Sequence, residues 1–104
     1  MNDEQKAICH KIADHYGEHH QMLKAVEEMA ELIQVIVKDM GYSADPVPNR
    51  EYYIEELADV AIMIEQLVYA CNSNFNGSIS LREAISYKLE RQLRRMEDEN
   101  DEQT

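Results

Sequence analysis

Apolar side chains recur every three to four residues along most of this chain, the spacing that gathers them on one face of an α-helix. The three glycines and two prolines fall between these periodic stretches, where they end helices or form turns. The pattern therefore predicts an all-α protein. The four expected helices run from about Asp3 to Tyr16, from Glu18 to Met40, from just after Asn49 to Cys71 and from Ser80 to Glu97.

Residues at the predicted boundaries support these limits. Gly17 is placed to cap the C-terminal end of the first helix, and Asn49 can cap the N-terminal end of the third. Ser80 and Glu83 have the spacing of a capping box at the start of the fourth helix. We expect a single helical domain over residues 1–97 and a flexible acidic tail over residues 98–104.

The hydrophobic positions also bear on oligomeric state. Around the third helix, apolar side chains point in nearly every direction, so this helix must be covered on most sides. Four helices from a chain of 104 residues cover it poorly, so we expect a bundle completed by oligomerisation, as a homodimer or homotetramer. A monomeric bundle with some exposed apolar residues is the alternative. On the second helix, the stripe expected to be buried consists of Met22, Val26, Met29, Ile33, Ile36 and Met40.

Composition narrows the choice of partners. The formal charge of -11 disfavours binding to nucleic acid polymers and to anionic membrane surfaces, because both require an excess of Lys and Arg. Acidic residues interrupt the apolar stretch from Ile54 to Cys71, so we expect no membrane span. The opening MNDEQK lacks the features of a secretion signal, and a cytoplasmic location is expected. Cys9 and Cys71 are expected to be reduced, packed thiols.

Two acidic fragments stand out within the apolar runs. Glu28 and Glu31 are three residues apart, as are Glu56 and Asp59, so each pair lies on one face of its helix. Like charges in these positions repel each other, and no basic residue occurs between positions 51 and 81 to relieve the second pair. Such carboxylates need compensation.

Hard oxygen ligands that converge from two adjacent helices suit Mg²⁺ or Mn²⁺. Glu56 carries most of this argument, because its spacing to Val60 and Met63 places it at the edge of the buried stripe of its helix. The sequence therefore predicts a divalent metal site. The alternative for the first fragment alone is an ordinary acidic helix surface, with Lys24 paired to Glu28.

The fourth helix carries the complementary charge. Lys88, Arg91 and Arg95 fall within one arc of this helix. A basic arc together with metal-binding acids indicates a polyphosphate ligand, whose oxygens would bridge the metal and the guanidinium groups. For a single arginine, an ordinary surface pair such as Glu90 with Arg94 is the alternative.

The acidic motifs resemble those of a known family. EExxE, followed after about two dozen residues by ExxD, is similar to the motif of the MazG-like all-α nucleoside triphosphate pyrophosphohydrolases. The fragments HYGEHHQMLKAVEEMAELIQ and EELADVAIMIEQL resemble the second and third helices of that family, and YKLERQLRR resembles its basic fourth helix. The resemblance extends from about Tyr16 to Arg95 and implies an antiparallel four-helix MazG-like bundle.

The resemblance also implies an activity, which is hydrolysis of a nucleoside triphosphate between the α and β phosphates to give a monophosphate and pyrophosphate. By match to the motif, Glu28, Glu31, Glu56 and Asp59 would ligate Mg²⁺ or Mn²⁺, and Lys24, Lys88, Arg91 and Arg95 would contact phosphate oxygens. Glu27 or Glu55 would orient the attacking water, and the sequence does not choose between them. The aromatic candidates for stacking on the base are Tyr16, Tyr42, Tyr52, Tyr53, Phe75 and Tyr87.

Other interpretations compete with this one. His15, Glu18 and His19 have the HxxEH spacing of inverted zinc peptidases, but Gly17 lies inside the motif at an expected helix end. A ferritin-like di-iron site would require Glu-x-x-His, whereas acids occupy the third place after Glu28 and Glu56. A catalytically inactive MazG-like interaction or regulatory module is the remaining alternative, and the presence of all four acids argues against it.

Overall fold

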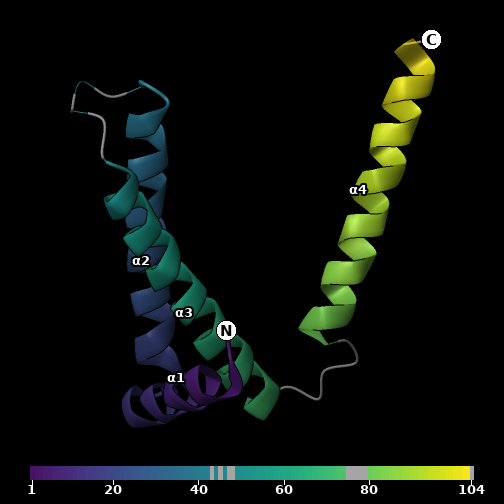
Figure 1. The fold of residues 1–104 in the computed structure, drawn as a ribbon. Coiled ribbons are helices and arrows are strands. Elements are labelled where there is room, and N and C mark those ends of the chain that lie inside the picture. Colours follow the sequence, from purple (N-terminus) through teal and green to yellow (C-terminus); the bar gives the residue numbers. More distant parts are fainter. Residues whose placement is uncertain (43, 45, 47–48, 75–79, 104) are drawn as a thin grey trace. The chain divides into compact units, whose positions relative to one another are not determined.

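The computed structural model is all-helical over the part of the chain that it describes, with four helices and no strands among these residues (Figure 1). It describes residues 1–42, 44, 46, 49–74 and 80–103, and side chains over the same ranges apart from 71–74 and 103. The all-α prediction is confirmed. The helices are α1 (Asp3–Tyr16), α2 (Glu18–Asp39), α3 (Arg50–Asn74) and α4 (Leu81–Gln103).

Side-chain caps fix the starts of three helices. Asn2 and Gln5 form a reciprocal capping box at α1, with bonds of 2.8 and 3.0 Å between side chain and backbone. The predicted caps are also observed, since Asn49 Oδ1 accepts from the amide of Tyr52 at 2.8 Å and Ser80 Oγ accepts from that of Glu83 at 3.1 Å. Each bond satisfies an amide that has no partner within the helix.

Helices α1, α2 and α3 form one compact unit, Met1–Asn74. Within it, α2 and α3 run antiparallel side by side, and α1 lies across one end of the pair and contacts both (Figure 1). On α1, Cys9 is buried, as predicted, and Ala13 is buried one turn later. Burial, followed by the charge of Glu65, raises the pKa of the Cys9 thiol. The side chain of Cys71 lies outside the described residues.

Hydrogen bonds and ring stacking join α1 to α3. His10 stacks on Tyr69 with ring centroids 4.1 Å apart and its Nε2 lies 3.1 Å from Glu65 Oε1. The Tyr69 hydroxyl donates to the carboxylate of Asp14 at 2.9 Å, and this bond raises the pKa of Tyr69. These polar contacts orient α1 on α3, where the packed apolar side chains are few.

The predicted apolar stripe of α2 is not the face that packs against α3. The buried residues of this helix are Gln21, Ala25, Glu28 and Val35. The exposed fractions of Met22, Val26, Ile33 and Met40, all members of the expected stripe, range from 50% to 65%. Periodicity identifies the most apolar face of a helix, but α3 packs against a different face, which carries small and polar side chains.

Helix α3 likewise buries polar side chains and exposes large apolar ones. Glu56, Met63, Gln66 and Ala70 are buried, whereas Ile54, Leu57, Ile62 and Ile64 remain exposed. The interface between α2 and α3 is therefore unusually polar for a pair of packed helices. The apolar faces of both helices are left uncovered within this unit.

Helix α4 belongs to a second compact unit, Phe75–Thr104. It does not end near Glu97 but continues to Gln103, so the residues expected to begin a flexible tail are helical as far as 103. Acids at Asp98 and Glu99 lie four residues after Arg94 and Arg95, a spacing that favours helix. Its apolar stripe, all of it exposed, consists of Leu81, Ile85, Leu89, Leu93 and Met96.

No helix within the described residues is long and apolar enough to cross a lipid bilayer.

The corner between α1 and α2 depends on one glycine. Gly17 has φ 87° and ψ 158°, a conformation that is essentially restricted to glycine, and its amide donates to the carbonyl of Ala13 at 2.8 Å. A Cβ atom here would meet nothing within 4 Å, so only the backbone conformation excludes a side chain.

We expect Gly17→Ala to lower the free energy of unfolding by about 1 to 3 kcal/mol, because alanine strains this conformation. Thermal or urea unfolding followed by circular dichroism measures the change. His19→Ala, at an exposed position in the first turn of α2, is the matched control and should unfold like the wild type. Equal stability of Gly17→Ala would mean that the corner has another backbone conformation.

Candidate metal site

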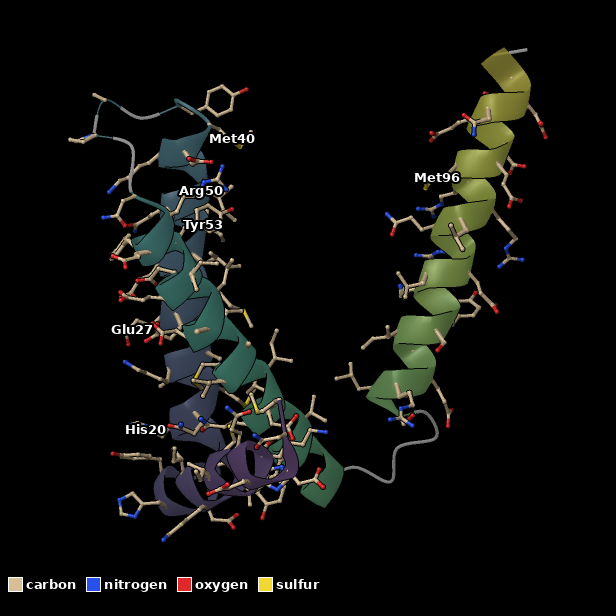
Figure 2. The ribbon with its side chains drawn as sticks, viewed as in Figure 1. His20, Glu27, Met40, Arg50, Tyr53 and Met96 are labelled. Atoms are coloured by element: carbon tan, nitrogen blue, oxygen red, sulfur yellow. The ribbon has the colours of Figure 1, made fainter. Side chains whose placement is uncertain are left out.

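Three of the four predicted metal ligands converge where α2 and α3 pack together. Glu28 and Glu31 on α2 and Glu56 on α3 each offer a carboxylate oxygen, and these three oxygens lie within 4.8 Å of one another. Figure 2 shows oxygen-bearing side chains gathered along this part of the two helices, near the labelled Glu27. The antiparallel packing of α2 and α3 thus brings together acids that are about two dozen residues apart in the sequence.

Two of these carboxylates are buried and incompletely bonded. The exposed fractions are 9% for Glu28 and 6% for Glu56. Their Oε2 atoms are buried and have no hydrogen-bond partner within the described part of the chain. An unsatisfied polar atom in a protein interior costs about 1 to 3 kcal/mol, and more when it is charged. The seam, meaning the interface between α2 and α3, therefore contains two carboxylate oxygens that lack a positive partner.

Lys24 supplies only part of the compensation. Its Nζ atom lies 3.2 Å from Glu28 Oε1 and 3.7 Å from Glu27 Oε2. The hydrogen bond to Glu28, followed by the charges of Glu27 and Glu28, raises the pKa of Lys24. The predicted surface pair of Lys24 with Glu28 is therefore present, but it occupies one oxygen of Glu28 and leaves the other buried without a partner.

Mutual repulsion is visible in two neighbouring carboxyl groups. The charge of Glu28, then burial and the charge of Glu56, raise the pKa of Glu31. Burial, then the charges of Glu28 and Glu55, raise the pKa of Asp59. Asp59 is not one of the three converging residues, but its carboxyl group lies within hydrogen-bonding reach of Glu28 when Asp59 is protonated. The fourth predicted ligand thus borders the site.

The donor set fits a hard divalent cation. Oxygens on opposite sides of an octahedral Mg²⁺ are about 4 Å apart, so a spread of 4.8 Å requires only small side-chain adjustments. All three donors are carboxylates, which favours Mg²⁺ or Mn²⁺ over zinc or iron. Among the described residues, His15, Glu18 and His19 do not form a group that could hold a metal.

The other predicted site residues lie outside the cluster of three acids. Glu27 and Glu55 are exposed on α2 and α3 near the cluster, where Glu27 pairs with Lys24 and Glu55 acts on the pKa of Asp59. Lys88, Arg91 and Arg95 lie on α4 in the second unit, so their approach to the acids stays a prediction.

The six aromatic candidates for base stacking also stay predictions. Tyr16 stacks on His20 with ring centroids 4.8 Å apart, Tyr42 is exposed, and Tyr87 lies on α4. Tyr52 and Tyr53 lie in the first turn of α3, and Phe75 falls outside the described residues.

One polar pair beside the site was not anticipated from the sequence. Gln21 and Gln66 are buried and hydrogen-bonded to each other across α2 and α3. The available signal was their spacing, because Gln21 lies seven residues before Glu28 and Gln66 seven residues after Asp59.

Comparisons with protein-family models, with characterised proteins and with solved structures find no match to this chain. The resemblance of the acidic motif to that of MazG-like enzymes stays a prediction.

We expect Asp59→Asn to raise the melting temperature of the metal-free protein at pH 7 by about 1 to 4 °C, because it removes one of several like charges. The folded state raises the pKa of Asp59 above its ordinary value of 3.8, so it binds this proton more tightly than the unfolded state does. The contribution of this group to stability is thus lost as the pH rises from about 3.8 through the raised pKa.

Differential scanning fluorimetry in the presence of a chelator, from pH 4 to 8, measures this effect. Glu90→Gln on α4, which removes the same charge away from the cluster, is the control. A destabilised Asp59→Asn protein would show that the carboxylate has a favourable partner without metal.

Proposed function

We propose that this chain binds Mg²⁺ or Mn²⁺ through Glu28, Glu31 and Glu56, with Asp59 as a fourth ligand, and hydrolyses a nucleoside triphosphate to a monophosphate and pyrophosphate. One observation carries the metal site. The Oε2 atoms of Glu28 and Glu56, on facing helices, are buried without partners. One carboxylate oxygen from each of Glu28, Glu31 and Glu56 lies within 4.8 Å of the other two.

A divalent cation would remove the electrostatic conflict of this seam. It would bond to the free oxygens of Glu28 and Glu56 and neutralise the repulsion that raises the pKa of Glu31. Proton uptake is the competing remedy, in which a protonated carboxyl group such as that of Asp59 would donate a hydrogen bond to Glu28. Mg²⁺ sites that also bind substrate phosphates are usually built from carboxylate ligands.

The reaction class follows from the residues around the site. A bound divalent cation would neutralise charge on the phosphate oxygens and lower the pKa of a bound water. Lys24 stands beside Glu28, where its ammonium group can contact a phosphate oxygen. Glu27 or Glu55 is exposed near the cluster, where it can orient the attacking water and accept its proton.

The basic arc of α4 supports a polyphosphate substrate. Lys88, Arg91 and Arg95 have the three- and four-residue spacing of one helix face. Lys88 and Arg95 are exposed, and Arg91 is half-buried. Several convergent cationic donors are the recognition that a triphosphate requires. The resemblance of the acidic motifs to MazG-like enzymes selects nucleotides within the wider class of polyphosphates.

A catalytically inactive MazG-like interaction module is the second candidate. The exposed apolar faces of α2 and α3 favour it, because large exposed apolar areas mark interaction surfaces. A module without activity would have no need of the buried carboxylate oxygens.

We expect Mg²⁺-dependent release of pyrophosphate from at least one member of a panel of ribo- and deoxynucleoside triphosphates. Glu56→Gln should lower kcat/KM at least about 100-fold, because it removes a charged ligand from a site that stabilises phosphoryl charge. Coupled detection of pyrophosphate measures the rate, and Glu51→Gln, at an exposed position on the same helix, is the matched control.

The outcomes separate the candidates. Activity that survives Glu56→Gln and chelation would contradict the metal assignment. Mg²⁺ binding without activity on any nucleotide would favour the inactive module.

We further propose that a second copy of the chain covers the apolar faces, giving a MazG-like bundle completed as a homodimer or homotetramer. Met22, Val26 and Ile33 are exposed on one face of α2, with exposed fractions of 50%, 65% and 60%. Such a stripe is typical of a helix that packs against another helix, and identical chains offer the same stripe to each other.

We expect Ile33→Lys to reduce the molar mass of the assembly, because the charge would be buried between copies. Gln34→Lys, at an adjacent exposed polar position, adds the same charge outside the stripe and should leave the mass unchanged. Light scattering coupled to size-exclusion chromatography gives the mass. A monomeric wild-type protein at micromolar concentration would refute the proposed assembly.

A further inference from the structure

We infer that Gln21 and Gln66 are positioning residues for the metal site: their hydrogen bond sets the register of α2 on α3 that brings the carboxylates together. This inference rests on the proposed metal site. It assigns a role to the most buried polar pair of the described residues, neither of which is a metal ligand.

The geometry of the pair is well defined. Gln21 Nε2 donates to Gln66 Oε1 at 2.6 Å, and the exposed fractions of the two residues are 4% and 2%. The side-chain oxygen of Gln21, Oε1, lies 2.7 Å from Nδ1 of His20. A carbonyl oxygen can only accept, so Nδ1 of His20 carries the proton in this contact. Tyr16 stacks on the His20 ring, and Figure 2 shows His20 nearer α1 than Glu27 along α2.

The spacing links this pair to the acids. Gln21 precedes Glu28 by seven residues, and Gln66 follows Asp59 by seven, which is about two helical turns on each helix. In an antiparallel pair, a step forward on one helix matches an equal step back on the other. The register that places Gln21 opposite Gln66 therefore also places Glu28 opposite Asp59.

Three residues farther along, the same register places Glu31 opposite Glu56. The observed geometry agrees with the second pairing, because carboxylate oxygens of Glu31 and Glu56 lie within 4.8 Å of each other. One hydrogen bond thus defines the positions of both facing acidic pairs.

The rest of the seam is less able to specify this register. Ala25 and Met63, between the glutamines and the acids, are apolar, and apolar contacts tolerate a slip of one turn better than directional bonds do. A slip would leave both buried amides without partners, and this penalty disfavours it. A single buried polar residue fixes helix register in coiled coils by the same principle.

Positioning and bulk stability can be measured separately. Replacing a buried polar pair with apolar residues of similar size often leaves stability unchanged or raises it. The inference therefore predicts a loss of metal affinity without a loss of folding, which a purely structural role would not produce.

The test uses the full chain and Mn²⁺ as the probe. Affinity is measured by electron paramagnetic resonance or calorimetry, with helix content and melting temperature followed in parallel. The double variant Gln21→Leu/Gln66→Leu should bind Mn²⁺ at least about 10-fold more weakly, the range seen when groups that support ligands are removed. Its helix content should be unchanged and its melting temperature equal or higher. Met63→Leu, an apolar exchange in the same seam, is the control and should retain wild-type affinity.

A second variant probes the pair without altering the buried residues. His20 is exposed, and His20→Phe keeps an aromatic ring against Tyr16 but removes the Nδ1 donor to Gln21. This variant should bind Mn²⁺ more weakly than the wild type.

Each outcome has one meaning. Unchanged Mn²⁺ affinity in the double variant would overturn the inference, as would weaker binding accompanied by lost helix content, which would assign the pair a structural role. No Mn²⁺ binding by the wild-type protein would instead refute the proposed metal site. Binding that is lost in Glu56→Gln but kept in the double variant would leave the metal site standing and refute the positioning role.

Discussion

Repulsion between carboxylates held in the seam of two packed helices is the constraint on which the remaining features of this structure depend. Glu28 and Glu56 are both buried, and each has an oxygen that nothing in the described chain satisfies. Water would relieve such groups in the open, but packing excludes it here. Lys24 compensates the charge of this seam only in part, and this shortfall is the reason for proposing a bound cation.

The same seam explains why the apolar faces are turned outward. A helix pair that holds acids, glutamines and a small alanine between its members cannot also bury its largest hydrophobic side chains there. Val26 and Ile33 consequently lie on the opposite side of α2. The proposed metal binding and the proposed association would thus use two different faces of α2.

Sequence reasoning succeeded where the governing interactions are local. Caps at Asn49 and Ser80 and the glycine at position 17 act within one helical turn, so the helix limits were largely predictable. The convergence of Glu28, Glu31 and Glu56 was predictable too, because matched spacings on two adjacent helices leave few other arrangements.

What the sequence could not provide was the choice between faces, which depends on the packing partner. The stripe through Met22 was the most apolar face of α2, yet α3 packs against the face with Gln21 and Ala25. The hydrogen bond between Gln21 and Gln66 was not predicted, because glutamine is usually a surface residue. The extension of α4 to Gln103 was missed because an acidic run was taken for a tail, although its spacing from arginines favours helix.

The burial of Cys9 on α1 has a consequence for the reactivity of its thiol. Because the thiolate is the form that oxidants and electrophiles attack, a raised thiol pKa together with burial keeps Cys9 protonated and out of reach. Helix α1, fastened to α3 through His10 and Asp14, thus serves as a redox shield for its own cysteine. Detachment of α1 from α3 would expose this thiol to oxidants.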